Sequence, residues 1–197
     1  MVTESDYREA ARNPLVRQDF LNAIDLEEAK EYICKVVYEP VDIEGTPMRL
    51  IAPLLTKIFT KRGLKSKIEV LPNAFSYLSF NYFMNGLIDH EGFHARQVYE
   101  IPAAIKKVIQ QGHITNIGYP AIELPTYENQ RLSSRFRFAT EHERSQVHEK
   151  IYICHKAIND ESRGNSLKEL EESLSCVIGN AKVHEVIKER WRRAHKF

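Results

Sequence analysis

Cysteine is scarce in this sequence. The chain has three cysteines among 197 residues, Cys34, Cys154 and Cys176, and no two of them form a CxxC pair. A disulfide framework needs an even set of cysteines at regular spacings. The sequence therefore argues against such a framework and indicates a reducing compartment, so we expect a cytoplasmic protein.

Long apolar runs and a surplus of charge of one sign are also missing. The most apolar window, residues 70–88, is interrupted by a proline and by amide and hydroxyl side chains that lipid cannot satisfy. Residues 1–9 are too polar for a signal peptide. The net charge is +1, and basic residues gather only at 188–197, which is typical of the solvated face of a last helix. We therefore expect no membrane span and no clear nucleic-acid binding.

The apolar residues that are present recur mostly at helical spacing. The periodicity predicts helices at 4–12, after Pro14, and at 26–37, 47–62, 79–100 and 122–158. One segment, 65–71, alternates polar and apolar residues and predicts a strand. The predicted fold is mostly α (α+β), a helical domain with a small sheet of few strands. A polar linker at 159–166 would separate a domain over 1–158 from a helical appendage over 167–197.

The stretch at 89–96, Asp-His-Glu-Gly-Phe-His-Ala-Arg, contains an HExxH motif. Residues four apart lie on one face of a helix, so His90 and His94 present two imidazoles to the same point, as a zinc tetrahedron requires. Glu91 lies on the flank, where its carboxylate can accept the proton of a zinc-bound water. The motif predicts a zinc site in which Glu91 is the general base.

A third ligand must come from elsewhere, because catalytic zinc usually has three protein ligands and the longer HExxHxxGxxH pattern is absent. The next predicted helix offers Glu123 and Glu128. We favour Glu123, which we place at the first helical residue, because Pro125 is tolerated within a first turn. Thr126 is also small enough to let the two helices approach closely. Glu128 remains the alternative.

Other polar side chains of that helix are candidates for supporting roles. His142 and His148 are alternative third ligands if neither glutamate binds. Tyr127, His142 and His148 are candidate donors to a transition-state oxyanion, although their spacing carries no signal. More often, such histidines are polar neighbours that are satisfied by hydrogen bonds.

These features resemble the zincin metallopeptidases, specifically the small gluzincin-like kind. In that family a backing helix, a strand, the HExxH helix and a later helix with a glutamate ligand follow in order. Here those elements would be 47–62, 65–71, 79–100 and 122–140, roughly half the chain. The resemblance implies that His90, His94 and Glu123 bind Zn²⁺ and that Glu91 is catalytic. It also implies that the strand is the edge along which a peptide or protein substrate lies.

Two other interpretations compete with this one. A di-iron carboxylate bundle also uses an ExxH motif, as in Glu91-x-x-His94, but it needs two such pairs and no other histidine here has a glutamate three positions before it. A non-catalytic helical protein that binds a metal or a partner protein is the stronger alternative. The sequence predicts neither the substrate nor the oligomeric state.

Overall fold

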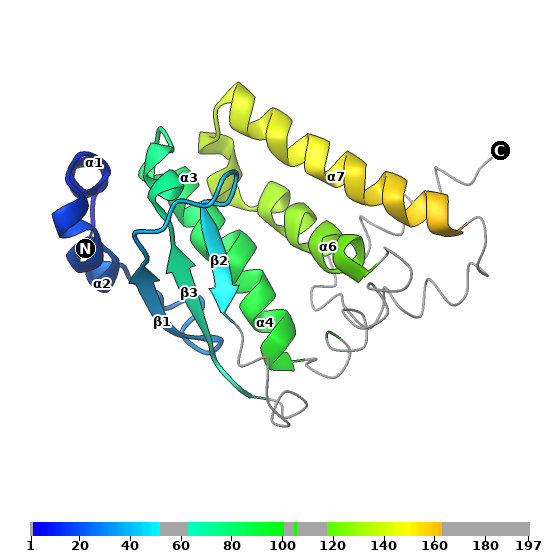
Figure 1. Cartoon of the computed structure of the whole chain (residues 1–197), viewed down its shortest axis with the longest axis horizontal. Helices are drawn as coiled ribbons and strands as arrows, with labels where there is room; N and C mark the ends of the chain where they lie inside the picture. Colours follow the sequence, from blue (N-terminus) through cyan, green and yellow to red (C-terminus); the bar gives the residue numbers. More distant parts are fainter. Residues whose placement is uncertain (1, 52–62, 101–104, 106–117, 163–197) are drawn as a thin grey trace.

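Helices make up most of the described chain, and its strands form one small sheet (Figure 1). The structure is a computed structural model that describes residues 2–51, 63–100, 105 and 118–162. In chain order the elements are α1 (Glu4–Arg12), the 3₁₀ helix η1 (Pro14–Val16), α2 (Arg17–Ala23), β1 (Ile33–Tyr38), β2 (Met48–Ile51), β3 (Ser66–Val70), the 3₁₀ helix η3 (Pro72–Ser76), α3 (Phe80–Met84), the π-helix η4 (Asn85–Glu91), α4 (Gly92–Glu100), α6 (Gly118–Leu132), the 3₁₀ helix η5 (Ser134–Phe138) and α7 (Glu141–Ser162). The predicted α+β class is confirmed.

The sheet has the strand order β1-β3-β2, in which β1 is parallel and β2 antiparallel to β3. Strand β3 confirms the strand predicted at 65–71. Its central place agrees with its burial, since Ile68 and Val70 are fully buried. The prediction that this strand is a sheet edge is wrong. In the described part of the chain, β1 and β2 are the edges.

The helix predicted at 26–37 is wrong. Asp25 does accept a backbone hydrogen bond, from the amide of Glu27 at 2.9 Å, but it caps a turn. The chain then enters β1, where β-branched and aromatic residues favour a strand. Ile33 and Val36 are buried in the core, and this tertiary burial outweighs the weak helical periodicity.

The helix predicted at 47–62 is also wrong where it can be compared. Residues 48–51 form β2, which pairs with β3 from Met48↔Val70 to Ile51↔Lys67. Residues 52–62 lie outside the described residues. A turn at residues 44–45 precedes β2, and Gly45 adopts a positive φ of 69° there.

The helix predicted at 79–100 is confirmed as the continuous run α3–η4–α4. Ser79 caps it by accepting a hydrogen bond from the amide of Tyr82 at 3.1 Å. The middle of this run, η4, is π-helical, a wider winding that is rare and often lies at functional sites. It ends at Glu91, inside the HExxH motif.

The single helix predicted at 122–158 is two helices, α6 and α7, joined through η5. Ser133 has extended backbone at φ −65° and ψ 145°, which ends α6. Thr140 and Glu143 then form a capping box that starts α7, with hydrogen bonds of 2.7 and 3.2 Å in the two directions. Helix α7 continues to Ser162, so the predicted linker at 159–166 begins inside a helix. The predicted appendage at 167–197 lies outside the described residues.

Two apolar clusters pack on either side of the α3–η4–α4 run. One joins α1, α2 and the sheet through aromatic rings such as Tyr7, Phe20 and Phe83, and the other joins α4, α6 and α7 around Val98 and Leu124. Full burial of such a side chain stabilises the fold by about 1.5–3 kcal/mol. The HExxH helix is therefore packed on two faces. Among the described helices, none is long and apolar enough to cross a membrane.

Candidate metal centre

Three predicted ligands meet at one point. One donor atom each of His90, His94 and Glu123 lies within 4.8 Å of the other two, and these residues form a group that could hold a metal ion. His94 Nε2 is 3.3 Å from Glu123 Oε1, and His90 Nε2 is 3.7 Å from Glu123 Oε2. The three side chains are only 9–14% exposed. No second group of this kind occurs among the described residues.

The two imidazoles are brought together by the helix run 80–100. His90 is near the end of the π-helix η4, and His94 is in the first turn of α4. Their ring centroids are 5.0 Å apart and the ring planes are nearly perpendicular, at 84°. Both Nε2 atoms can therefore face Glu123 without the rings stacking on each other.

Helix α6 supplies Glu123, but from a different place than the sequence predicted. The helix begins at Gly118, so Glu123 lies in its second turn, and Pro125 is inside the helix. Proline removes one backbone hydrogen bond and weakens the regular ladder here. Thr126 confirms the expected close approach of the helices. It is fully buried, and its Oγ1 is 3.3 Å from His94 Nδ1.

Each imidazole has a glutamine on the side away from Glu123. His90 Nδ1 is 3.1 Å from Gln130 Oε1, and His94 Nδ1 is 3.0 Å from Gln97 Oε1. An amide oxygen only accepts, so each Nδ1 must carry the proton for these hydrogen bonds to form. In the neutral form of each ring, which is the form that binds a metal, the lone pair of Nε2 then faces Glu123. Such outer partners commonly fix the tautomer and orientation of metal-binding histidines.

The two histidines of the triad have pKa values that are shifted in opposite directions. Burial and, to a smaller extent, the neighbouring His94 lower the pKa of His90 to about 4, against the opposing effect of Glu123. Burial also lowers the pKa of His94, but the Glu123 carboxylate outweighs this effect and raises the pKa to about 9. One carboxylate can compensate one imidazolium, and a second proton would place two positive charges side by side.

Glu91 is outside the triad but next to it. The side chain is buried, and burial raises its pKa to about 7. His94 opposes that increase, Glu123 adds to it, and a hydrogen bond from the backbone of Leu50 in β2 opposes it. A carboxyl group that titrates near neutrality can both accept and return a proton at neutral pH. Its position and its pKa fit the base role that the sequence predicted.

The other candidates from the sequence do not join the triad. Glu128 is fully buried and forms an ion pair with Arg131 at 2.8 Å. His142 and His148 are exposed on α7, where His142 contacts Gln146 and His148 lies near the ring of Phe136. None of these residues belongs to the donor group.

Tyr127 is the one oxyanion candidate that lies beside the site. Its ring centroid is 4.7 Å from that of His90. Its ring thus lies next to a predicted ligand, and a donor role for its hydroxyl stays a prediction. His142 and His148 are on the surface of α7, and we no longer expect either to serve as this donor.

Sequence reasoning missed the two supporting glutamines. Gln97 follows His94 by three residues, so helical spacing alone places it on the neighbouring turn of the same face. Gln130 follows Glu123 by seven residues, two turns along α6 on the same face. Both signals are present in the sequence, but the second has meaning only once α6 is known to lie across the HExxH helix.

Comparison with known protein families, with curated proteins and with solved structures found no match to this chain. The class that the fold and the site define is therefore stated from the structure alone. The chain is a mostly helical α+β protein with a His-His-Glu group that could hold a metal ion.

Proposed function

We propose that this protein is a zinc-dependent hydrolase of the zincin kind, in which His90, His94 and Glu123 bind Zn²⁺ and Glu91 is the general base. One observation carries the proposal: both histidines have their Nδ1 atoms held by glutamines, so that both Nε2 atoms face one carboxylate. Two imidazoles and a carboxylate form a ligand set typical of catalytic zinc, with a fourth position open.

The chain's own residues supply the remaining chemistry. Zinc in such a site lowers the pKa of a coordinated water towards neutrality and polarises a substrate carbonyl. Glu91 is beside the triad, where its carboxylate would accept a proton from the attacking water. It later returns the proton to the leaving group. Burial around Glu91 raises the pKa of its carboxyl to about 7, which makes both transfers accessible near neutral pH.

A peptide is the substrate class that the surroundings favour. Strand β2 is an edge of the described sheet, and the backbone of its Leu50 is hydrogen-bonded to Glu91. An extended peptide that adds to this edge would run directly past the proposed base. The edge strand for substrate is thus β2, in place of the segment 65–71 that the sequence suggested.

Metal analysis and one matched pair of variants test the proposal. Purified tag-free protein supplied with zinc should hold about one zinc per chain, because the triad forms a single site. His94→Ala should lose that zinc. Glu91→Gln should keep it but lose hydrolysis of a mixed peptide library, because the amide retains the shape of the carboxylate and cannot accept a proton.

Different failures point to different conclusions. Substoichiometric zinc that His94→Ala does not change would refute the metal site. Loss of zinc in Glu91→Gln would indicate that Glu91 is itself a metal ligand and would favour the di-iron carboxylate alternative. Stoichiometric zinc with no hydrolysis by the wild type would favour the non-catalytic metal-binding alternative.

A further inference from the structure

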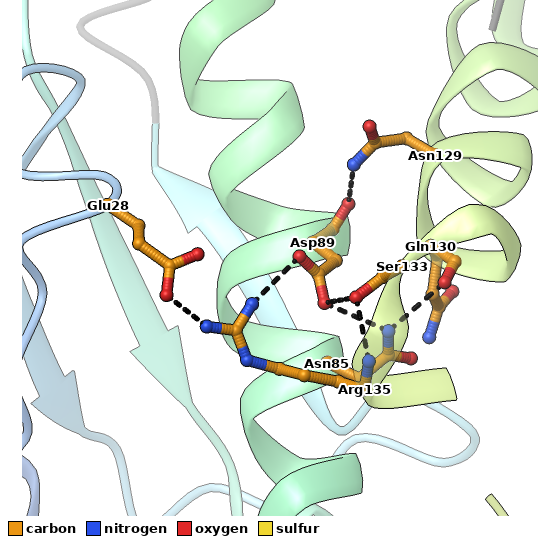
Figure 2. Close-up of polar contacts among 7 residues, drawn as sticks. All are labelled: Glu28, Asn85, Asp89, Asn129, Gln130, Ser133 and Arg135. Atoms are coloured by element: carbon orange, nitrogen blue, oxygen red, sulfur yellow. Dashed lines mark hydrogen bonds and ion pairs between the residues drawn. The ribbon is translucent and has the colours of Figure 1, made fainter. Parts of the chain in front are cut away.

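A polar network surrounds Asp89, the residue immediately before His90 (Figure 2). Its carboxylate accepts hydrogen bonds from Ser133 Oγ at 2.5 Å, from Asn85 Nδ2 at 3.0 Å and from Arg135 Nη1 at 3.1 Å. Ser133 and Arg135 belong to the segment that ends α6, whereas Asn85 and Asp89 belong to η4. The carboxylate thus joins the HExxH helix to the end of the helix that carries Glu123.

The network reaches the triad through Gln130. Asn85 Nδ2 also donates to the backbone oxygen of Gln130 at 3.1 Å, and Asn129 Nδ2 donates to the backbone oxygen of Asp89 at 2.7 Å. The side chain of Gln130 is the partner of His90 Nδ1. Three hydrogen bonds, through Asn85 and Gln130, therefore connect the Asp89 carboxylate with the imidazole of His90.

Arg135 connects this buried point to the surface. Its guanidinium lies between Asp89 and Glu28, a residue in the turn before β1, and forms an ion pair with each (Figure 2). The Asp89 side chain is 13% exposed, whereas that of Glu28 is 62% exposed. An ion pair in a partly buried position contributes more than one in water, and three donors on one carboxylate fix its orientation.

We propose that Asp89, with Ser133 and Arg135, is a positioning device that sets how α6 sits on the HExxH helix, and so sets the geometry of the His90–His94–Glu123 triad. The inference rests on the proposed metal site. The network acts through the backbone of Gln130 and through the register of the two helices.

Asp89→Asn is the most direct test of this device. The variant keeps the size of the side chain but replaces one oxygen by an NH₂ group, a donor that would face other donors. It also removes the negative charge that pairs with Arg135. The matched control is Glu69→Gln, another buried carboxylate with two cationic partners, Arg49 and Lys67, outside this network. A second control, Arg137→Gln, removes an arginine of the same turn that lies over the ring of Phe138.

The measurements are the Co²⁺ affinity of each folded protein, the visible spectrum of the Co²⁺ form and the unfolding of the metal-free protein. We expect Asp89→Asn to weaken Co²⁺ binding about 10–100-fold and to shift the visible bands, as losses of outer partners of metal ligands do. Both controls should stay within about twofold of the wild type and keep its spectrum. Glu69→Gln also removes a buried, paired charge and can lower stability as much as Asp89→Asn. A loss of Co²⁺ affinity in Asp89→Asn alone would therefore not be explained by lower stability.

Ser133→Ala removes one donor and no charge, and it serves if Asp89→Asn does not fold. It should weaken Co²⁺ binding by about tenfold, the lower end of the same range. Unchanged affinity and spectrum in both network variants would overturn the positioning role while leaving the zinc proposal intact. Equal losses in Glu69→Gln would also overturn it. A wild type that binds neither Co²⁺ nor Zn²⁺ would instead refute the metal site, and this inference with it.

Discussion

His90 and His94 face the same carboxylate, but their surroundings hold them in different ways. His94 is supported from its own helix by Gln97, three residues further on, and additionally by Thr126 of α6. The Nδ1 of His90 contacts the side-chain oxygen of Gln130, forty residues along the chain on α6. The His94 region is therefore largely assembled when one helix forms, whereas the His90 region depends on the docking of a second helix.

The pKa values of the two imidazoles diverge as well, to about 4 for His90 and to about 9 for His94. Glu123 is closer to His94, by 3.3 Å against 3.7 Å, and its single charge compensates one imidazolium. In the metal-free protein His94 is thus the protonated partner and His90 the neutral one. Three predictions test this difference, from the largest effect to the smallest.

Removal of the carboxylate that both histidines share should have the largest effect. Glu123→Gln should weaken zinc binding by more than about 100-fold, because the loss of an outer partner alone reaches that range. Glu128→Gln is the matched control, since it makes the same change in a buried glutamate of the same helix. It should cost stability through Arg131 but keep zinc affinity, as measured by chelator competition. If Glu128→Gln weakened zinc binding more than Glu123→Gln, Glu128 would be the third ligand.

The motif itself was readable from the sequence because its geometry is local. His90, Glu91 and His94 lie within five residues, and any helix brings the two imidazoles to one face. Glu123 could be chosen over Glu128 for a related reason, namely the small Thr126 beside it. The capping box of Thr140 and Glu143 was also local, and it would have predicted the break between α6 and α7.

The errors share a different cause. Strands β1 and β2 exist because they pair with β3, which is far away in the sequence, and this burial outweighs the helical periodicity of both segments. The same holds for Gln130 and the Asp89 network, whose partners come from separate helices. Contacts between residues one helical turn apart could be predicted from the sequence. Contacts between separate elements could not, because they depend on how those elements pack.

The pKa difference predicts a loss of stability of the metal-free protein at alkaline pH. The pKa of His94 is raised from its ordinary value of 6.5 to about 9, so its contribution is present below pH 6.5 and is lost as the pH rises through 9. The pKa of His90 is lowered, so its contribution is lost only as the pH falls towards 4. Glu91, with a pKa of about 7, is half protonated at pH 7 and contributes a smaller pH dependence as it loses the rest of its proton above that pH.

His94 therefore dominates the window from pH 7 to 9, and a comparison with His94→Gln separates its contribution from that of Glu91. With chelator present, the free energy of unfolding of the wild type should fall by about 2 kcal/mol more than that of His94→Gln across this window. His90→Gln is the control and should keep the wild-type slope. Urea unfolding at the two pH values measures this. Equal slopes in wild type and His94→Gln would show that His94 is not the protonated partner.

The smallest effect should come from the supporting glutamines, and it should be unequal. Gln130→Met leaves His90 Nδ1 without its acceptor and should weaken zinc binding about tenfold or more. Gln97→Met should cost only a few-fold, because Thr126 Oγ1, at 3.3 Å, can still accept from His94 Nδ1. Methionine has nearly the shape of glutamine, so the change removes hydrogen bonding and leaves the packing.

The double variant Gln97→Met/Thr126→Val makes this asymmetry decisive. If Thr126 compensates for the missing amide, the double variant should lose about as much zinc affinity as Gln130→Met, whereas Thr126→Val alone should lose little. Chelator competition measures the zinc affinity of the wild type, Gln97→Met, Thr126→Val and the double variant. These four affinities form a double-mutant cycle. Additive, small losses would mean that His94 is held by its helix backbone alone. Equal losses in Gln97→Met and Gln130→Met would mean that the two imidazoles are supported alike, despite the different origins of their partners.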